Sequence, residues 1–516
     1  MVNKNYFTKI PAQTRESVLD VALDTIRLNK QAIIFVNSKR SAESVAEKIA
    51  NKLKLDDKEL EEYKIISDKA LKALSNPTKQ CKRLALCLEK GIAFHHAGLR
   101  SEQRRIIETN FRERKIKVIC ATPTLAQGVD LPAYRTIIRD LKRFTQHGMR
   151  NIPVLEYEQQ AGRAGRPGQE KLGQAIIFAK DEKDKKKIIE KYVFGEPEDI
   201  LSKLAVEPIL RTYVLSLIST EYCKTKKDLQ NFFSKTFFAF QYEDEKELNF
   251  IIENNIIKLE EWGFIKVFQE NKNNDFISAK DYNKKEAVKI RPTLLGKRVS
   301  ELYLDPYTAN YIINYLKQEL LSPVSLLFMF SNCIEMRPLL SVGVRTTNET
   351  ESWLNDYEEK LGDENELLSA DYFELLKAVR TTMFLHDWIN EFTEDRILEK
   401  FGARPGEINA KIETLDWLIY SAAEISRLSN KDVIKYLIRL RIRAKNGCKE
   451  ELIPLLKFKN IGRVRARKLF SNNIRNVHDV KTEKYEKIAE IIGKKLALQL
   501  KSDVGITVAD EQIKLI

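Results

Sequence analysis

The segment YEQQAGRAGRPGQ, residues 157–169, places two arginines three residues apart, each directly after a glycine. Glycine tolerates backbone conformations that other residues avoid, so the chain can turn here and present both side chains the same way. The guanidinium groups of Arg163 and Arg166 can then clamp a γ-phosphate and offset the charge that develops during its transfer. Taken alone, a Gly-Arg repeat is equally consistent with a solvated basic turn.

A second loop with possible phosphate chemistry is ATPTLAQGVDLP, residues 121–132, which follows the apolar stretch KVIC. The hydroxyls of Thr122 and Thr124 can bind phosphate, and Gly128 permits a close approach of the backbone. Asp130 can accept from a ribose hydroxyl or order an arginine. The alternative is a plain loop bounded by prolines.

The elements around these loops predict an α/β domain. The run AIIFV at 32–36 is typical of a buried strand, and the loop after it starts at Asn37. We expect a helix from Ser101 to Arg112, a further strand in GQAIIFAK at 173–180, and a strand end at VLEY, 154–157. Strands that alternate with helices indicate a parallel sheet covered on both faces, where ligands collect at the carboxyl ends of the strands.

The remainder of the chain has a different character. Residues 200–300 hold three helical stretches and a possible ribbon, which favours a winged-helix module. From about residue 305 to 442 the pattern is nearly all helical and predicts a bundle, and the last 70 residues form a small basic helical unit. The expected domains are therefore 1–198, RecA-like; 199–302, winged helix; 303–444, helical bundle; and 445–516, a DNA-binding helical domain.

Composition narrows the class of protein. With 43% hydrophobic and 31% charged residues, the 516-residue chain is globular and long enough for several cores. The net charge of +14 favours a polyanionic partner, although charge alone does not choose among DNA, RNA and an acidic membrane. No run is long and apolar enough to span a bilayer, and no secretory leader is evident, so we expect a cytoplasmic protein. The six cysteines form no C-x-x-C pair, and no metal site is expected.

Four stretches together resemble helicase motifs. The segments IIFVNSKRSAESVAEKI, AFHHAGLRSEQRRIIE, KVICATPTLAQGVDLP and QQAGRAGRPG resemble motifs IV, IVa, V and VI of superfamily-two helicases, in the branch of the archaeal Hjm-type DNA helicases. The resemblance continues through TLLGKRVSELYLDP, LHDWINE, ETLDWL and IGRVRARKLF, and so covers nearly the whole chain. It implies the second RecA-like domain of such a helicase, followed by a winged helix, a ratchet bundle and a tail similar to a helix-hairpin-helix.

The resemblance also implies roles for the loop residues. Gln159, Arg163 and Arg166 would reach ATP held by the first RecA-like domain, with Arg166 as the arginine finger. Gly128 and Asp130 would lie on the nucleotide side of motif V. The implied contacts of this domain to the bound nucleic acid are Asn37, Thr122, Thr124 and Phe144. Phe144 lies near the tip of a ribbon, residues 136–157, that matches the family's strand-separating hairpin; the alternative for Phe144 is a buried aromatic.

Two further regions would hold DNA. The family's ratchet helix resembles EINAKIETLDWLIYSAAEI, where Trp417 would stack on single-stranded bases, unless it is a core residue. The family's arginine one heptad earlier is Ala410 here, with Lys411 beside it as a possible substitute. In the tail, Arg463, Arg465, Arg467 and Lys468 would hold phosphates without reading sequence. The alternative for these four residues is a solvated basic helix.

One expected motif is missing. The sequence contains no G-x-x-x-x-G-K-[ST] and no D-E-x-H; LLGKRV at 294–299 and IIGKKL at 491–496 lack the first glycine and the following Ser or Thr. We therefore expect ATP and Mg²⁺ to be held mostly by a first RecA-like domain on a separate chain or a missing N-terminal part. The chain alone should be inactive.

The leading hypothesis is the C-terminal half of an ATP-dependent 3′ to 5′ DNA helicase that acts on forked or single-stranded-tailed DNA in repair or replication restart. The alternatives are a non-catalytic DNA-binding factor and one half of an RNA helicase.

Overall fold

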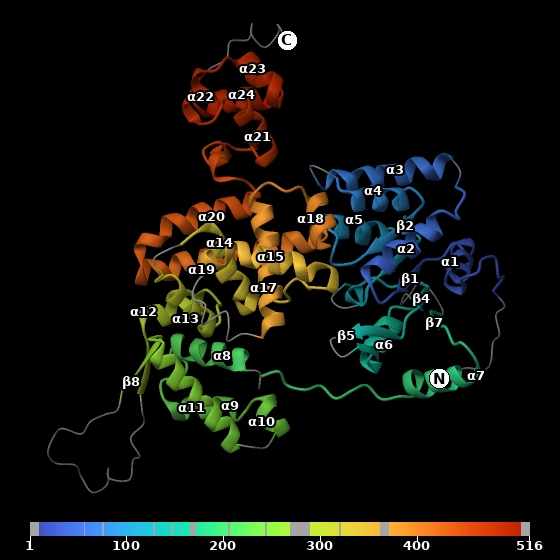
Figure 1. Cartoon of the computed structure of the whole chain (residues 1–516). Coiled ribbons are helices and arrows are strands. Elements are labelled where there is room, and N and C mark those ends of the chain that lie inside the picture. Colours follow the sequence, from blue (N-terminus) through green and yellow to red (C-terminus); the bar gives the residue numbers. More distant parts are fainter. Residues whose placement is uncertain are drawn as a thin grey trace, which may run out of the picture. The chain divides into compact units, whose positions relative to one another are not determined.

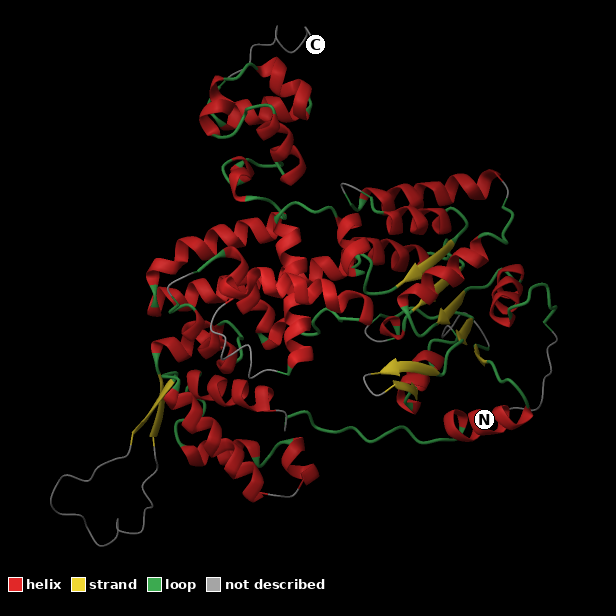
Figure 2. Ribbon diagram, viewed as in Figure 1, coloured by secondary structure: helices red, strands yellow, loops and turns green. Residues whose placement is uncertain are grey.

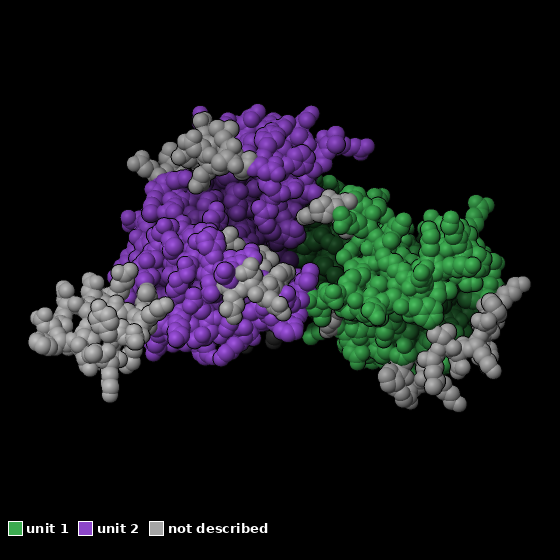
Figure 3. All heavy atoms as spheres, turned by 90° about the horizontal axis from the view of Figure 1, so that it is seen from below, with its two compact units in different colours: residues 1–200, 394–409 green, residues 201–393, 410–516 purple. Residues whose placement is uncertain are grey.

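The chain divides into two compact units, coloured separately in Figure 3. Unit 1 contains residues 1–200 and 394–409, and unit 2 contains residues 201–393 and 410–516. The computed structural model describes residues 10–506 apart from 56, 75–76, 127–128, 146–147, 166–171, 205–206, 243–244, 269–288, 319–320 and 362–370.

Unit 1 is built on a parallel sheet (Figures 1 and 2). Among the described residues, five strands pair in the order β2-β3-β1-β4-β7. The strands are β1 Ala32–Phe35, β2 Ile92–His95, β3 Val118–Ala121, β4 Arg135–Ile138 and β7 Gln174–Ile177. Every residue of β1 to β4 is buried, as expected for strands covered on both faces. The predicted parallel sheet is confirmed.

Helices precede, connect and follow the strands of this sheet. They are α1 Ser17–Arg27, α2 Lys39–Ala50, α3 Asp57–Lys72, α4 Lys79–Leu88, α5 Ser101–Arg112, α6 Val154–Ala161 and α7 Glu182–Ile188, with the short helices η1 Pro123–Leu125 and η2 Ile189–Val193. Helix α2 packs on β2 and β3, and α6 packs on β4. Helix α2 begins after Ser38, whose hydroxyl accepts from the Ser41 N–H at 3.2 Å. This is the side-chain cap expected of a serine before a helix.

The prediction of a strand end at VLEY is wrong, because residues 154–157 begin α6. Pro153 precedes the helix and supplies no N–H of its own. The carboxylate of Glu198 accepts from the backbone N–H groups of Val154 at 2.8 Å and Leu155 at 3.1 Å. This cap comes from more than 40 residues along the chain, so the local sequence does not announce it. Arg163 consequently lies in a turn after a helix.

The predicted ribbon, residues 136–157, contains a shorter antiparallel pair, because residues 136–138 belong to β4 and 154–157 begin α6. Strand β5, Lys142–Thr145, pairs with β6, Gly148–Asn151, so that Phe144 lies opposite Met149. Figure 1 shows the pair beside α6.

Unit 2 is helical apart from one antiparallel pair, β8 Ile265–Phe268 with β9 Lys289–Pro292, within the part of the chain that is described. Before this pair lie α8 Glu207–Ser219, α9 Lys226–Phe233, α10 Phe237–Tyr242 and α11 Glu245–Glu261. After it come α12 Leu294–Glu301, α13 Pro306–Tyr315, α14 Pro323–Asn332, η3 Ile334–Met336, α15 Val344–Leu361, α17 Tyr372–Ile389, α19 Pro405–Ser429, η4 Lys431–Val433 and α20 Ile434–Asn446. Helix α18, Glu394–Phe401, and the first turn of α19 belong to unit 1.

The C-terminal part of unit 2 has its own apolar cluster, with Leu452, Ala466, Leu469, Ile488 and Leu500 among its buried residues. Its elements are η5 Glu450–Leu452, η6 Leu455–Lys457, α21 Arg463–Ser471, α22 Val477–Thr482, α23 Tyr485–Ile492 and α24 Lys494–Asp503. The expected small helical unit is thus present.

Candidate functional site

Arg163 lies directly after α6, where the Gly162 N–H closes the helix on the Glu158 carbonyl at 2.7 Å. The Arg163 guanidinium donates to the Ala126 carbonyl at 2.5 Å and lies 3.6 Å from the Asp130 carboxylate. The Arg163 side chain is 22% exposed. Of the two roles predicted for Asp130, its position favours the ordering of an arginine.

Backbone hydrogen bonds join the two loops that carry these residues. The Ala133 N–H donates to the Arg163 carbonyl at 2.9 Å, and the Gly165 N–H donates to the Ala133 carbonyl at 2.7 Å. Gly165 has φ +95°, a conformation that favours glycine. Arg166 and Gly128 lie outside the described residues, and Gln159 is half-buried on α6. The structure therefore brings Arg163 and Asp130 together and leaves the position of Arg166 as a prediction.

The threonines of the second loop differ in access. Thr122 is 8% exposed, and its hydroxyl lies 3.0 Å from the hydroxyl of Thr124, which is exposed. Asn37 is exposed, but its amide donates to the Lys142 carbonyl at 3.4 Å and its N–H donates to the Asp140 carboxylate at 3.0 Å. Thr124 is therefore the more accessible of the two threonines, and Asn37 supports the base of the β5–β6 hairpin.

The hairpin presents apolar side chains to solvent. Phe144 is 80% exposed and Met149, opposite it, is 60% exposed. Exposure of a paired aromatic and methionine has a cost in water unless a ligand covers them. The alternative of a buried aromatic at position 144 is thus wrong.

An ion pair ties this hairpin to α6. The Arg143 guanidinium on β5 lies 2.7 Å from the carboxylate of Glu156, which is 10% exposed. Burial raises the pKa of the Glu156 carboxyl, and the charge of Arg143 opposes that rise. The Gln160 amide also donates to Glu156, at 3.4 Å. The residue next to Phe144 is therefore held by the helix that leads into Arg163.

Helix α19 carries the residues predicted for the ratchet. Trp417 is half-buried, and its indole N–H donates to the Leu302 carbonyl at 3.1 Å. The Lys411 ammonium donates to the carbonyls of Met336 and Pro338, the latter at 2.7 Å, and burial lowers the pKa of Lys411 to about 8. Lys411 is thus engaged inside unit 2, in contrast to its predicted role as a nucleic-acid contact.

The four basic residues of the tail fall into two groups. The Arg463 guanidinium lies 4.5 Å from the ring centre of Trp388 and donates to the carbonyls of Phe392 and Gly447, both at 3.3 Å. Trp388 is 6% exposed and is therefore a core residue of unit 2.

Arg467 also points into the protein, where it pairs with Glu391 at 2.6 Å and Glu451 at 2.8 Å. Arg465 and Lys468 are exposed. Positions four apart share a helix face, so Arg463 and Arg467 lie on the inner face of α21. The structure differs here from the expectation of four phosphate contacts and leaves Arg465 and Lys468 as the accessible pair.

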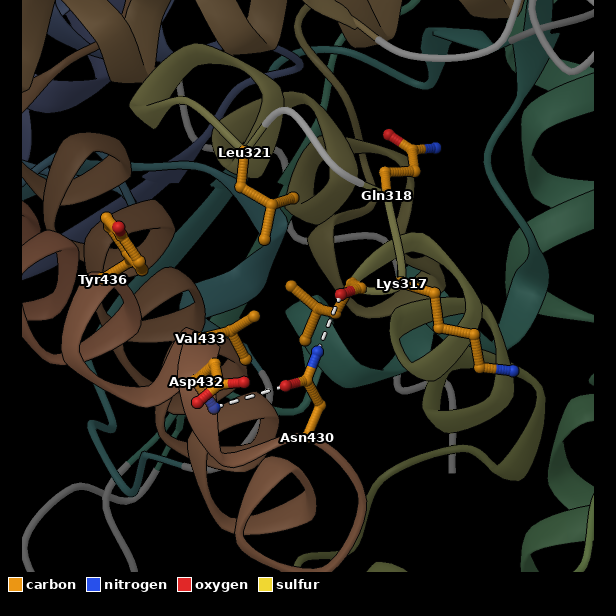
Figure 4. A pocket seen from close by; sticks show the side chains of 8 residues that line it. Lys317, Gln318, Leu321, Asn430, Asp432, Val433 and Tyr436 are labelled. Atoms are coloured by element: carbon orange, nitrogen blue, oxygen red, sulfur yellow. Dashed lines mark hydrogen bonds between the residues drawn. The ribbon is translucent and has the colours of Figure 1, made fainter.

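A pocket of about 250 Å³ in unit 2 contains none of the predicted residues (Figure 4). It is lined by Leu316, Lys317, Gln318, Leu321, Asn430, Asp432, Val433 and Tyr436. The Asn430 side chain bridges its walls, since its amide donates to the Leu316 carbonyl and its oxygen accepts from the Asp432 N–H, both at 3.2 Å. Elsewhere in the described ranges, no group of His, Cys, Asp and Glu could hold a metal ion, and none of the helices there could cross a membrane.

Comparison with known families gives two matches. Residues 68–168 match the family described as Helicase conserved C-terminal domain, and residues 324–447 match the family described as Archaeal helicase, domain 4. The first match includes the loops that hold Arg163 and Asp130, and the second includes Trp417 and Lys411.

Curated relatives match over almost the whole chain. The chain is 36% identical to the "ATP-dependent DNA helicase Hel308" of Methanococcus vannielii, over 99% of this chain and 70% of that protein. The chain belongs to the Hel308 family of helicases. Hel308 proteins of Methanocella arvoryzae and Pyrococcus horikoshii are also 36% identical, over 95% and 92% of this chain. The chain spans 65% and 64% of the length of these two Hel308 relatives.

Sequence reasoning missed several residues that organise this Hel308-family chain. Arg143 and Glu156 belong to a strand and a helix, and no spacing rule links them. The buried Glu43 and the half-buried Arg404 form an ion pair at 3.0 Å although they are 361 positions apart. One sequence signal could have indicated Glu43: it is a charged residue among apolar ones, between Ala42 and Val45, on the buried face of α2. Charged residues on buried faces are rare unless they are paired.

Proposed function

We propose that this chain supplies the second RecA-like domain, the winged helix, the ratchet helix and a C-terminal DNA-binding domain of an ATP-dependent 3′ to 5′ DNA helicase. Its substrates are forked or single-stranded-tailed DNA, in repair or replication restart. The names of its Hel308 relatives, all ATP-dependent DNA helicases, favour DNA over RNA.

The observation that carries the proposal is the attachment of the hairpin to α6. Phe144 on this hairpin is 80% exposed, and the residue before it, Arg143, pairs with Glu156. An exposed aromatic ring can stack on the first base pair of a duplex, and stacking is worth about 1–3 kcal/mol per base. The hairpin acts as a wedge because α6 holds its root in place.

On the nucleotide side, Arg163 and Arg166 face the γ-phosphate of ATP, with Arg166 as the arginine finger. Arg163 is already oriented by Ala126 and Asp130, so little of its freedom remains to be lost on binding. The sequence offers no phosphate-cradling loop, and the chain spans 64% to 70% of its relatives. We infer that a segment carrying the G-x-x-x-x-G-K-[ST] and D-E-x-H motifs, called the Walker segment below, holds ATP and Mg²⁺.

On the DNA side, helices α8 to α11 followed by the β8–β9 pair have the order of a winged helix. Trp417 on α19 stacks on the translocated strand with the face of its ring, while its N–H stays bonded to Leu302. Arg465 and Lys468 grip phosphates beyond the bundle.

The test is unwinding of a forked DNA by the protein together with its Walker segment. A 3′-tailed fork should be unwound with ATP, a 5′-tailed fork should not, and an RNA fork of matched sequence should compete poorly. Binding of forked DNA without unwinding, with or without ATP, would instead support a non-catalytic binding factor. Equal unwinding of the RNA fork would contradict the DNA assignment.

A further inference from the structure

A buried carboxylate in unit 1 gathers charged and polar partners from three parts of the chain. Glu43 on α2 is 3% exposed. One of its oxygens accepts from the Gln80 amide at 2.9 Å and the Arg404 Nε at 3.0 Å, and the other accepts from Arg83 at 2.8 Å. His96 Nε2 lies 3.2 Å from the first oxygen.

The protonation of this cluster follows from its hydrogen bonds. His96 Nδ1 accepts from the Gly98 N–H at 3.1 Å, so the proton of the neutral ring sits on Nε2, the nitrogen that lies near Glu43. Burial would raise the pKa of Glu43, but His96 and Arg404 lower it to about 2. Burial also lowers the pKa of His96. A neutral histidine therefore orients an ionised carboxylate, and the carboxylate holds Arg404.

Arg404 comes directly before helix α19, and the first turn of that helix fits the same surface of unit 1. The Gly406 N–H donates to the Gly98 carbonyl at 2.9 Å. A Cβ added at Gly406 would lie 2.4 Å from the carbonyl oxygens of both Ala97 and Leu99, so only glycine allows this approach.

Further ion pairs hold the neighbouring residues of the segment. Lys39 pairs with Glu407, Arg100 pairs with Glu394 at 3.0 Å, and the Arg100 guanidinium donates to Asn409. The segment 394–409 is therefore a built-in part of unit 1, although α18 and the first turn of α19 lie in the sequence among the helices of unit 2.

Helix α19 continues from this anchor into unit 2, where it carries Trp417. An α-helix rises 1.5 Å per residue, so Trp417 lies about 20 Å along the axis from Arg404. A hydrogen-bonded helix transmits a push or rotation at its first turn along its length.

We propose that Arg404, held by Glu43 and His96, is the positioning residue that couples the RecA-like domain to the ratchet helix. Movement of unit 1 during ATP turnover is delivered to Trp417 through the anchored first turn of α19. This inference rests on the proposed helicase function and identifies the connection that converts hydrolysis into strand movement.

The first arm of the test uses this chain alone and does not depend on helicase activity. Arg404→Ala and Glu43→Gln should each speed hydrogen exchange of the amides at 406–409 by at least about tenfold, because the anchored turn opens locally. Lys79→Ala is the matched control: Lys79 pairs with Glu399 of the same segment at 2.7 Å, but both side chains are more than 60% exposed. Unchanged exchange in Arg404→Ala would overturn the anchor.

The second arm measures base pairs unwound per ATP hydrolysed, with the Walker segment present. Arg404→Ala should lower that ratio about tenfold while DNA-stimulated hydrolysis stays within about twofold, since the nucleotide residues are untouched. Lys79→Ala should match wild type, and Arg404→Lys should fall between, because lysine keeps the charge but not the Nε donor.

An unchanged ratio in Arg404→Ala, or a fall of hydrolysis in parallel with unwinding, would overturn the coupling role. If Arg404→Ala does not fold, Arg404→Lys and Glu43→Gln test the coupling role instead, by hydrogen exchange at 406–409 and by base pairs unwound per ATP. Absence of unwinding by the wild-type protein would contradict the helicase function itself, and the exchange arm would still decide the anchor.

Discussion

Arg143 on the hairpin strand β5 lies 2.7 Å from the carboxylate of Glu156 on α6, a side chain that is 10% exposed. The pair joins the hairpin that we propose to face the duplex to the helix that ends at Ala161, two residues before Arg163. The Arg143 side chain is 44% exposed while Glu156 is largely buried, so removal of Arg143 would leave a poorly solvated carboxylate without its partner.

Replacement of Arg143 by alanine should separate hydrolysis from unwinding. The hairpin loses its attachment, so fork unwinding should fall about tenfold, or ~1.4 kcal/mol, while DNA-stimulated ATP hydrolysis stays near wild type. The free energy of unfolding should fall by about 1–2 kcal/mol because Glu156 keeps a buried charge. Arg150→Ala is the control, since Arg150 lies opposite Arg143 in the same hairpin. Equal effects of the two substitutions would show that the ion pair has no special role.

Phe144→Ala should impair strand separation without affecting the fold. Its side chain is 80% exposed, so the melting temperature should stay within about 1 °C of wild type. Unwinding of a forked duplex should drop by about five- to tenfold, and Phe144→Trp should restore most of it, because stacking depends on the aromatic face. Leu86→Ala, at a side chain 64% exposed on α4, provides a control for loss of exposed apolar surface. Full unwinding by Phe144→Ala would remove the hairpin from the mechanism.

The four basic residues of the tail should differ in their effects on the salt dependence of DNA affinity. A cation that contacts phosphate contributes about one unit to the slope of log affinity against log salt concentration. Arg465→Ala and Lys468→Ala should each reduce that slope by about one at unchanged melting temperature. Arg463→Ala and Arg467→Ala should instead lower the melting temperature, since these side chains hold Trp388 and Glu391. If Arg463→Ala and Arg467→Ala reduced the slope instead, at unchanged melting temperature, these two residues would be the phosphate ligands.

The Glu43 cluster should make unit 1 sensitive to acid. The pKa of Glu43 is about 2 in the folded chain against 4.5 ordinarily, so between these values the unfolded chain binds the proton and the folded chain does not. The stability that the ionised Glu43 contributes is therefore fully present above pH 4.5 and is lost as the pH falls toward 2.

The lowered pKa of His96 acts in the same direction and starts the loss below its ordinary value of 6.5. The free energy of unfolding should be measured in urea at several pH values. Between pH 4.5 and 2, its slope against pH should correspond to about one bound proton fewer in Glu43→Gln than in wild type. An identical pH dependence in the variant would mean that Glu43 is not ionised in the fold.

Much of unit 1 could be predicted from the sequence, because buried parallel strands are short apolar runs and their helices carry local caps. AIIFV forms β1 within one residue, and the helix expected at Ser101–Arg112 has those bounds in the structure. The strand predicted at VLEY was wrong because a run of four residues fits both the two-residue repeat of a strand and the 3.6-residue repeat of a helix. The Glu198 carboxylate that caps the helix is distant in the chain.

The site was predictable as a set of loops but not as a set of contacts. Motif spacing identified Arg163 and Asp130, and the structure places them 3.6 Å apart. It could not indicate that Lys411 binds two carbonyls or that Arg463 stacks on Trp388, since the conformation of a long cationic side chain depends on partners from other elements.

The central claim is that arginines of this chain complete a nucleotide site whose phosphate cradle lies on the Walker segment. It is tested most directly by the rate of DNA-stimulated ATP hydrolysis of the two together, with Arg166→Ala and Arg163→Ala beside wild type. We predict that wild type raises the rate at least about 1,000-fold over the Walker segment alone and that Arg166→Ala removes most of this gain. A rate equal to that of the Walker segment alone, or full activity of Arg166→Ala, would contradict the account.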